Sequence, residues 1–334
     1  MVQQEITARS VSNGFSLLNR LLTFPTAILQ RSWRDLITMT QLFDRQLIHL
    51  YWFTGAGNSL IAAIALAERF RELGLAVELR ALEGHDPCEL DPAAVFGLVF
   101  PTHCFTLPEI VRQYAEQLPQ VDRVPAFMVN TVGVTSGGGV CGPLKRILTE
   151  KGFICHGAKI LMMPDSFFAF VHGRLARRMI RAAVRRVQTF ADRLVAGQTH
   201  WRRVPVITDA WAALMRRIFA SRNLFAPLFR YPRVIARSKT CTQCGLCAKH
   251  CPVGALSLGS LEEANPEHDD NDRKQVRHHT IPIMLPPEPS MGCTLCLRCV
   301  AVCPTSAMRL RLMMLPPYRP DSQKELLRLF NDNS

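Results

Sequence analysis

Eight of the twelve cysteines fall into two short runs with the same internal spacing. Each run reads C-x2-C-x2-C-x3-C-P; the members are Cys241, Cys244, Cys247 and Cys251, then Cys293, Cys296, Cys299 and Cys303. Three thiolates in a tight turn can hold three corners of an iron–sulfur cube, and where such runs occur in two-cluster proteins the fourth cysteine ligates the other cluster. The doubled run therefore predicts two [4Fe–4S] clusters.

The duplication supplies the exchange of fourth ligands that this arrangement requires. We assign Cys303 to the cluster of the first run and Cys251 to the cluster of the second run. Zinc is disfavoured because zinc sites use paired C-x2-C units separated by a spacer. The polar stretch 261–280 between the runs is predicted to be a surface excursion with solvated histidines. The four scattered cysteines are expected to be small buried apolar residues; they are Cys88, Cys104, Cys141 and Cys155. For Cys104 and Cys141 a catalytic thiol is the alternative.

A second candidate site is the loop Thr54-Gly55-Ala56-Gly57-Asn58-Ser59, between a predicted strand and a predicted helix. Its glycines let the backbone approach an anion, and the helix start supplies unpaired N–H groups at the positive end of the dipole. Thr54, Asn58 and Ser59 add side-chain donors. The lysine of a nucleoside-triphosphate loop and the G-x-G-x-x-G spacing of dinucleotide folds are both absent. The loop therefore fits a phosphate monoester such as that of FMN.

The elements around this loop alternate between strand and helix. Apolar runs predict five strands, at 47–53, 75–79, 95–100, 125–130 and 153–163. Apolar residues at helical spacing predict intervening helices, at 60–74, 108–118 and 143–151. This alternation is typical of a parallel sheet covered on both faces. We therefore expect an α/β domain with a doubly wound five-stranded parallel sheet.

Residues 47–165 resemble a flavodoxin domain, and Thr54–Ser59 matches its FMN-phosphate loop. The resemblance implies that the isoalloxazine lies between two further loops, at 101–108 and 131–139. The FMN-binding residues that it implies are Thr54, Gly55, Ala56, Gly57, Asn58, Ser59, Thr102, His103, Phe105, Thr131 and Gly133. The Trp and Tyr that commonly stack on the flavin are missing, and Phe105 and His103 are the candidates in their place.

The predicted fifth strand leads into Met162-Met163-Pro164-Asp165, and an aromatic pair and a basic helix come next. Over roughly 47–310 the chain resembles fusions of a flavodoxin domain with a bacterial two-cluster ferredoxin domain, which implies a small α+β domain around the cysteines. The expected division is a helical extension at 1–45, a flavodoxin-like FMN domain at 46–170, an Arg-rich connector at 171–237, a ferredoxin domain at 238–312 and a polar tail at 313–334. For the extension, a targeting peptide, a membrane-surface helix and an ordinary packing helix all stay open.

The net charge of +13 is concentrated in one segment. Residues 172–239 contain fifteen arginines and Lys239 against two aspartates, a net charge of +14. Two helices are predicted there, at 172–200 and 209–220, the second with Trp211 and Phe219. The first helix has an arginine face and an apolar face; the arginines are Arg174, Arg177, Arg178, Arg181, Arg185 and Arg186, and the apolar residues are Val171, Leu175, Met179, Ala182, Ala183 and Val187. A redox partner with an acidic surface, an anionic membrane surface and a solvated interdomain brace are the alternatives, in that order. Nucleic acid is disfavoured because nothing resembles a nucleic-acid-binding fold.

Composition limits the class of protein. The 334 residues correspond to roughly two domains, and 48% apolar with 20% charged residues excludes wholesale disorder. The sequence contains no stretch of eighteen apolar residues, so no membrane-spanning helix is predicted. A long chain with clustered cysteines and no signal peptide indicates metal ligation in a reducing compartment, not a secreted disulfide scaffold. We therefore expect a cytoplasmic protein, with peripheral attachment to a membrane as the alternative.

Together these features predict an electron-transfer iron–sulfur flavoprotein that passes electrons between FMN, two [4Fe–4S] clusters and a redox partner. Two alternatives stay open. One is a flavin-dependent reductase of a small organic acceptor such as a quinone. The other is a ferredoxin whose flavodoxin-like domain only docks partners. Whether the chain is itself an enzyme is left undecided.

Overall fold

A computed structural model gives the fold of the chain. The residues that it describes are 46–103, 106–133, 138–165, 173–201, 234–236, 240–259, 281–284 and 293–310, with a few isolated positions between 171 and 328. The chain divides into two units, Met1–Asp44 and Arg45–Ser334. The first unit, with the predicted extension, lies outside the described residues, as do the excursion at 261–280 and most of the helix predicted at 209–220.

Five parallel strands form the central sheet, in the order β2-β1-β3-β4-β5. Their bounds are Leu47–Trp52 (β1), Ala76–Ala81 (β2), Val95–Pro101 (β3), Val124–Val132 (β4) and Phe153–Met162 (β5). This order defines the flavodoxin-like variant of the doubly wound fold, whose topological switch point lies between β1 and β3. The predicted fold class is therefore confirmed.

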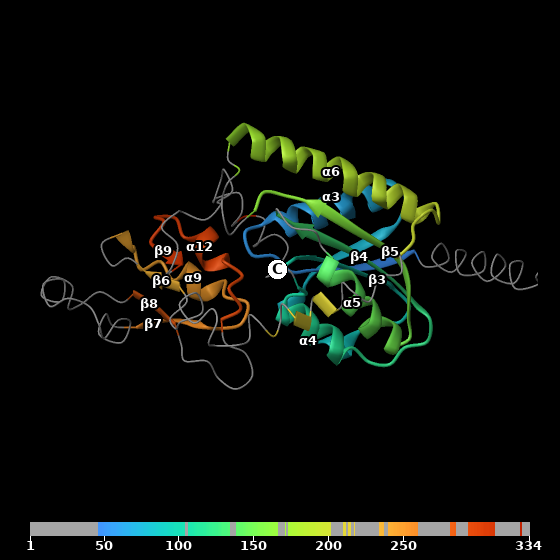
Figure 1. Ribbon diagram of the computed structural model, residues 1–334, viewed down its shortest axis with the longest axis horizontal. Helices are drawn as coiled ribbons and strands as arrows, with labels where there is room; N and C mark the ends of the chain where they lie inside the picture. The colour runs from blue at the N-terminus through green and yellow to red at the C-terminus, as the bar shows by residue number, and fades with distance from the viewer. Residues whose placement is uncertain are drawn as a thin grey trace, which may run out of the picture. The chain divides into compact units, whose positions relative to one another are not determined.

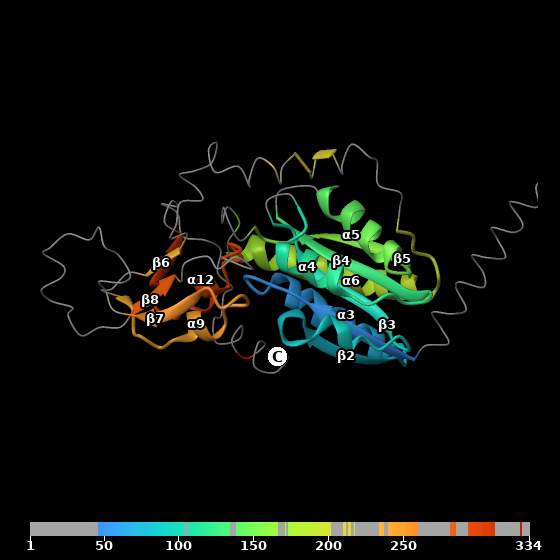
Figure 2. The ribbon, with the colours of Figure 1, turned by 90° about the horizontal axis from the view of Figure 1, so that it is seen from below.

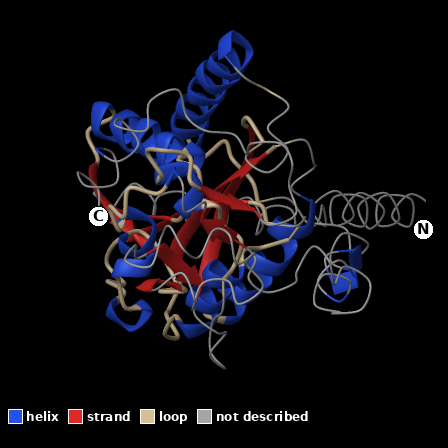
Figure 3. Cartoon of the chain, turned by 90° about the vertical axis from the view of Figure 1, so that its left-hand side faces the viewer, coloured by secondary structure: helices blue, strands red, loops and turns tan. Residues whose placement is uncertain are grey.

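Helices cover both faces of this sheet, as Figures 1 and 2 show. The helices α3 (Asn58–Glu72) and α6 (Gly173–Val195) pack together on one face, and α4 (Glu109–Gln117) and α5 (Gly138–Glu150) on the other. Between β2 and β3 stand only two 3-10 turns, Leu82–Gly84 and Pro87–Glu89. Seen along the long axis, the strands lie in the middle with helices around them (Figure 3).

The core explains why the strands are nearly continuous apolar runs. Every residue of β4 is buried, because helices cover both of its faces. Phe127 of β4 contacts Phe70 of α3 and Phe190 of α6, with ring centroids 5.6 and 6.3 Å apart. The segment that the sequence suggested as a connector thus begins with a helix packed on the sheet.

Two helices differ from their predicted extent. The helix α5 begins at Gly138, five residues before the predicted start at Pro143, so the proline lies inside it. Proline favours the first turn of a helix, which is why the sequence suggested a start there. The helix α6 ends at Val195, and Gly197 follows with a left-handed φ of 64°, a common way to end a helix.

The buried face of α6 matches the predicted one only in part, at Ala183 and Val187. Leu175, placed on the apolar face by the sequence, is 57% exposed. The face that packs inward is made by Ala176, Ala183, Val187, Phe190, Ala191 and Leu194. Among the described residues, no helix is both long and apolar enough to cross a membrane.

In its described residues, the cysteine-rich part has two short antiparallel ribbons and two short helices. Strand β6 (Val234–Ala236) pairs with β9 (Met308–Leu310), and β7 (Leu256–Gly259) pairs with β8 (Ile281–Met284). The helices are α9 (Leu246–Lys249) and α12 (Arg298–Val302), one in each cysteine run. Val234, Val300 and Met308 form a core there together with the ligand-type cysteines Cys247, Cys299 and Cys303.

Candidate functional site

Three loops meet at the carboxyl ends of β1, β3 and β4, beside the topological switch point where ligands of doubly wound folds bind. The N–H of Phe53 donates to the Val99 carbonyl at 2.9 Å, and the N–H of Thr102 donates to the Thr131 carbonyl at 2.9 Å. Thr102 Oγ1 also donates to Asn130 Oδ1 at 2.9 Å. These bonds bring together the three loops that the sequence indicated.

The loop after β1 is buried and held by its own polar side chains. Thr54 Oγ1 accepts from the N–H of Gly57 at 3.1 Å, and Asn58 Nδ2 donates to the Pro164 carbonyl at 2.8 Å. The hydroxyl groups of Ser59 and Thr131 lie 2.7 Å apart. Some of the polar side chains that the sequence suggested as ligand donors therefore bind the protein itself. They hold the shape of the loop and join it to β4 and to the end of β5.

Donors for an anion nevertheless remain at this loop. The helix α3 has no side-chain cap and no acidic residue in its first turn, so its first N–H groups point into the loop without a side-chain acceptor. Gly57 stands at the N-cap with a φ of 97°, a conformation that glycine adopts without strain. Two hydroxyls that share one hydrogen bond keep a second proton to donate. These donors, with no competing carboxylate in the first turn, fit the phosphate of FMN.

The loop after β3 closes on itself. His103 and Thr106 exchange backbone hydrogen bonds of 3.0 and 2.8 Å, and the His103 ring meets Phe53 edge to face at 5.8 Å. Burial lowers the pKa of His103 to about 4, so the ring is neutral at pH 7. Cys104 and the predicted stacking residue Phe105 lie outside the described residues.

The loop after β4 is close to the end of β5. A Cβ on Gly133 would lie 2.1 Å from Oδ2 of Asp165, so only glycine fits there without displacing that carboxylate. Residues 134–137 lie outside the described residues. Of the third predicted flavin loop, the structure thus describes the first residues, Thr131–Gly133.

The cysteines of the first run share their surroundings with Cys303. Burial is the main reason that the pKa of Cys247 rises to about 11, and the charges of Cys303, Cys244 and Cys241 raise it further. This neighbourhood contains the four ligands assigned to the first cluster. Cys244 is exposed and Cys303 is buried.

The cysteines of the second run share theirs with Cys251. Burial raises the pKa of Cys296 to about 11, with Cys293 and Cys251 among the neighbouring charges that add to the rise. Burial likewise raises the pKa of Cys299, whose neighbours also include these three thiols. Among the described residues, no three His, Cys, Asp or Glu side chains converge tightly enough for a single metal ion. Thiolates around a cube bind separate irons and are therefore spaced more widely.

The backbone repeats the duplication. Left-handed φ values occur at three equivalent pairs of positions, Gln243 and Leu295, Gly245 and Leu297, and Gly254 and Ser306. A leucine in this region is strained by roughly 1–2 kcal/mol, so the turn around the cysteines is kept at a cost in stability. N–H groups also reach the sulfurs: that of Ala255 lies 3.2 Å from Cys251 Sγ. Such hydrogen bonds tune cluster potentials.

Arg298, in the second run, is a residue that the sequence did not indicate as part of a site. Its Nε and Nη2 donate to the Thr54 carbonyl at 3.0 and 2.8 Å, and its Nη1 pairs with Glu83. The guanidinium lies 5.6 Å from the centre of the Phe53 ring, and Arg298 is only 3% exposed. Its partners Glu83 and Thr54 precede it in the chain by 215 and 244 residues, and a single sequence carries no signal that links such distant positions.

Beside it, the backbone of the second run touches the loop after β1. A Cβ on Gly55 would lie 1.8 Å from the carbonyl oxygen of Cys296. Cys296 and Val253 also pack against the core of the flavodoxin-like domain. The candidate phosphate loop and the second cysteine run are therefore in direct contact.

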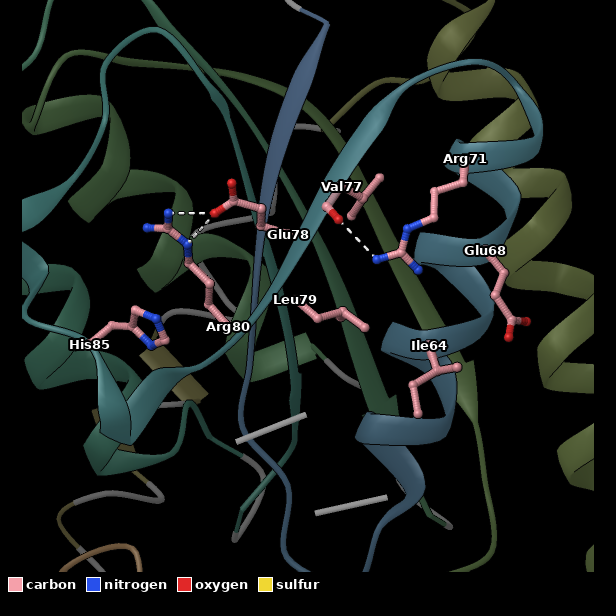
Figure 4. A pocket seen from close by; sticks show the side chains of 8 residues that line it. All are labelled: Ile64, Glu68, Arg71, Val77, Glu78, Leu79, Arg80 and His85. Atoms are coloured by element: carbon pink, nitrogen blue, oxygen red, sulfur yellow. Dashed lines mark hydrogen bonds and ion pairs between the residues drawn. The ribbon is translucent and has the colours of Figure 1, made fainter. Parts of the chain in front are cut away.

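Other features lie away from this site. A hollow of about 640 Å³ is lined by residues of α3 and β2 and by His85 (Figure 4). Within it Arg80 pairs with Glu78, and Arg71 donates to the Val77 carbonyl at 2.9 Å, so the polar groups largely bind one another. Cys88, expected to be buried, is exposed in the second 3-10 turn.

The arginines of α6 form an exposed face, as the sequence predicted. Arg174, Arg177, Arg178, Arg181, Arg185, Arg186 and Arg193 are all exposed. We call this set the α6 arginine face. Leu175 is exposed among them.

Comparisons with known proteins found similarities to parts of the chain. Residues 240–307 match the family model described as a 4Fe-4S dicluster domain. The chain is similar to a flavodoxin of Streptococcus pneumoniae TIGR4 (16% identity, 45% of this chain and 98% of that chain, TM-score 0.35). It is also similar to the two-electron reduced flavodoxin of Megasphaera elsdenii (18%, 41% and 98%, 0.31) and to the rubredoxin oxygen:oxidoreductase of Desulfovibrio gigas (18%, 46% and 37%, 0.31). No curated protein matches the sequence.

These TM-scores are low, so the fold of the first part rests on its strand order and connections. The chain is a fusion of a flavodoxin-like domain with a 4Fe-4S dicluster domain. Electron transfer is the chemistry of such iron–sulfur domains, and it requires a redox partner.

Proposed function

We propose that the protein is an electron-transfer iron–sulfur flavoprotein that passes electrons between FMN and two [4Fe–4S] clusters, and on to a redox partner. The observation that carries the proposal is the contact of the Cys296 carbonyl with Gly55. It brings a run of cluster ligands against the loop that fits a phosphate. A cluster-binding run held against the proposed FMN site within one chain suits short-range electron transfer.

The cluster ligands in this proposal are the eight paired cysteines. One cluster is held by Cys241, Cys244, Cys247 and Cys303, and the other by Cys293, Cys296, Cys299 and Cys251. The neighbourhoods of Cys247 and Cys299 support this exchange of fourth ligands. The domain boundaries predicted from the sequence also stay a proposal.

For FMN, the proposed phosphate site is Thr54–Ser59 with the first turn of α3. Thr102, His103, Phe105, Thr131 and Gly133 are the proposed neighbours of its ring system. When bound, FMN accepts two electrons and releases them one at a time, whereas each cluster carries one. The protein contributes the N–H donors of the loop, a neutral His103 and the exclusion of water by the buried loop.

Anaerobic purification with quantitation of iron, sulfide and flavin tests the proposal. We expect about eight iron and eight sulfide per chain, and about one FMN. The variant Gly57→Val should lose FMN and keep its iron, because a side chain at a φ of 97° distorts the loop. Gly74→Val is the matched control: Gly74 follows the other end of α3, has a φ of 84° and has no atom within 4 Å of its Cβ position. Equal FMN retention in both variants would refute the loop assignment.

A second candidate function is an iron–sulfur carrier whose flavodoxin-like domain is only a docking scaffold. It is favoured by the internal hydrogen bonds of Asn58 and Ser59, which engage two of the three expected side-chain donors. An anaerobically purified chain with full iron and no flavin, which also fails to bind added FMN, would establish this candidate in place of the first.

For the redox partner, we propose a protein with an acidic surface that meets the α6 arginine face, in the cytoplasm. Clustered exposed arginines accelerate encounter with an acidic surface, and salt weakens this steering. An anionic membrane is the competing surface, since Leu175, Trp211 and Leu214 are 57%, 51% and 49% exposed. Binding to anionic vesicles that is lost in Trp211→Ala would favour the membrane over the protein partner.

A further inference from the structure

Arg298 distinguishes the second cysteine run from the first. The two runs are equivalent in spacing and in their left-handed positions, and Arg298 occupies the place that Leu246 has in the first run. A buried guanidinium is costly unless its nitrogens find acceptors. Here it has three paired donors, two on one carbonyl and one on Glu83.

The hydrogen bonds from Arg298 orient the peptide group between Thr54 and Gly55. In a trans peptide the carbonyl and the following N–H point in opposite directions. Arg298 holds the Thr54 carbonyl on the side of the second run, so the N–H of Gly55 is directed to the opposite side. The fork of a guanidinium fixes this plane more firmly than a single donor can.

We propose that Arg298 is a positioning residue for the phosphate of FMN, acting through the Thr54–Gly55 peptide, so that the dicluster domain completes the flavin site. The inference rests on the proposed function. Because Arg298 lies between Cys296 and Cys299, its position depends on the fold of the second run around its cluster. FMN affinity is therefore coupled more strongly to the second cluster, which takes three ligands from this run, than to the first.

The test measures FMN and riboflavin affinity in the full chain with its clusters, after removal of flavin, by fluorescence titration under anaerobic conditions. Riboflavin lacks the phosphate, so a defect in the phosphate site changes only FMN binding. Arg298→Leu should weaken FMN binding by about tenfold, the worth of one charge-assisted hydrogen bond, and leave riboflavin binding unchanged. Arg298→Lys, which keeps the charge without the fork, should lie between Arg298→Leu and the natural protein.

Lys249→Leu is the matched control, because it removes an exposed positive charge from the first run. It should leave both affinities unchanged. An unchanged FMN affinity in Arg298→Leu, or an equal loss of FMN and riboflavin affinity, would overturn the inference. Failure of the natural protein to bind FMN at all would instead overturn the proposed function.

The coupling to one cluster has its own pair of variants. Cys299→Ser removes a proposed ligand of the second cluster, and Cys244→Ser removes one of the first. Iron content and electron paramagnetic resonance report which cluster is lost. FMN affinity should fall further in Cys299→Ser than in Cys244→Ser; equal FMN affinities in the two variants would contradict the coupling.

Discussion

Replacing Gly55 by alanine is expected to separate the second cysteine run from the candidate phosphate loop. The added Cβ would lie 1.8 Å from the carbonyl oxygen of Cys296 and 3.0 Å from its carbonyl carbon. Both atoms belong to the backbone, so no side-chain rotation relieves the overlap. The two segments must therefore move apart by about 1.5 Å to regain van der Waals contact.

A displacement of this size breaks the neighbouring hydrogen bonds. Nε and Nη2 of Arg298 lie 3.0 and 2.8 Å from the Thr54 carbonyl oxygen, and about 1.5 Å more takes both beyond hydrogen-bonding distance. Each such bond to a charged group contributes roughly 1.5–3 kcal/mol. We expect the free energy that holds the run against the loop to fall by about 3 kcal/mol, which is more than a hundredfold in the opening equilibrium.

Hydrogen–deuterium exchange measures this opening directly. Peptides that cover Thr54–Leu60 and Thr294–Val300 should exchange about a hundredfold faster in Gly55→Ala than in the natural chain. Gly84→Ala is the control, since a Cβ at Gly84, next to Glu83, meets no atom within 4 Å. Unchanged protection of both peptides in Gly55→Ala would show that the contact does not hold in solution.

Three further predictions concern the clusters, the arginine face and His103. Cys251→Ala should reduce iron from about eight to about four per chain by removing the second-run cluster; electron paramagnetic resonance that shows only the first-run cluster missing would contradict the ligand exchange. Reversing two charges, in Arg178→Glu with Arg185→Glu, should flatten the salt dependence of electron transfer to the partner at constant FMN and iron; an unchanged slope in stopped-flow rates would remove α6 as the docking face. Burial lowers the pKa of His103 to about 4, so as the pH falls below 6.5 the unfolded chain takes up the proton first and the folded state loses stability. Relative to pH 7, the loss at pH 5 should be about 2 kcal/mol smaller in His103→Phe, measured by thermal unfolding across this range, and parallel curves for the two proteins would argue against a ring that stays neutral in the folded state.

The sheet could be predicted from the sequence because its strands are buried on both faces. Such strands are continuous apolar runs, as in Val95–Phe100, and their ends fell within a few residues of the observed bounds. The helix α6 was predicted only in part, because its buried face includes small residues such as Ala176 and Ala191, whereas Leu175 is larger and exposed. Hydrophobicity alone therefore placed Ala183 and Val187 on the buried face correctly, but it placed Leu175 there wrongly.

The cysteine sets could be proposed from spacing because cluster ligands are local in sequence. Arg298 could not, because the Thr54 carbonyl is a backbone atom that any residue at that position would supply. Its partner Glu83 lies in a 3-10 turn where the alternation of strands and helices suggests nothing in particular. Contacts between two domains of one chain leave no periodic trace in a single sequence.

The short connection between β2 and β3 limits how freely the two domains can be recombined. Where a doubly wound fold usually has a full helix, this chain has two 3-10 turns, and the first presents Glu83 to Arg298. A chain cut after Trp201 would leave that carboxylate, the Thr54 carbonyl and the bare surface of Gly55 facing water. Conversely, an unrelated flavodoxin with a long helix at this place would not accept the dicluster domain in the same pose. The contact surfaces of the two domains are therefore specific to each other, and chimeras should keep residues 82–94 together with the second cysteine run.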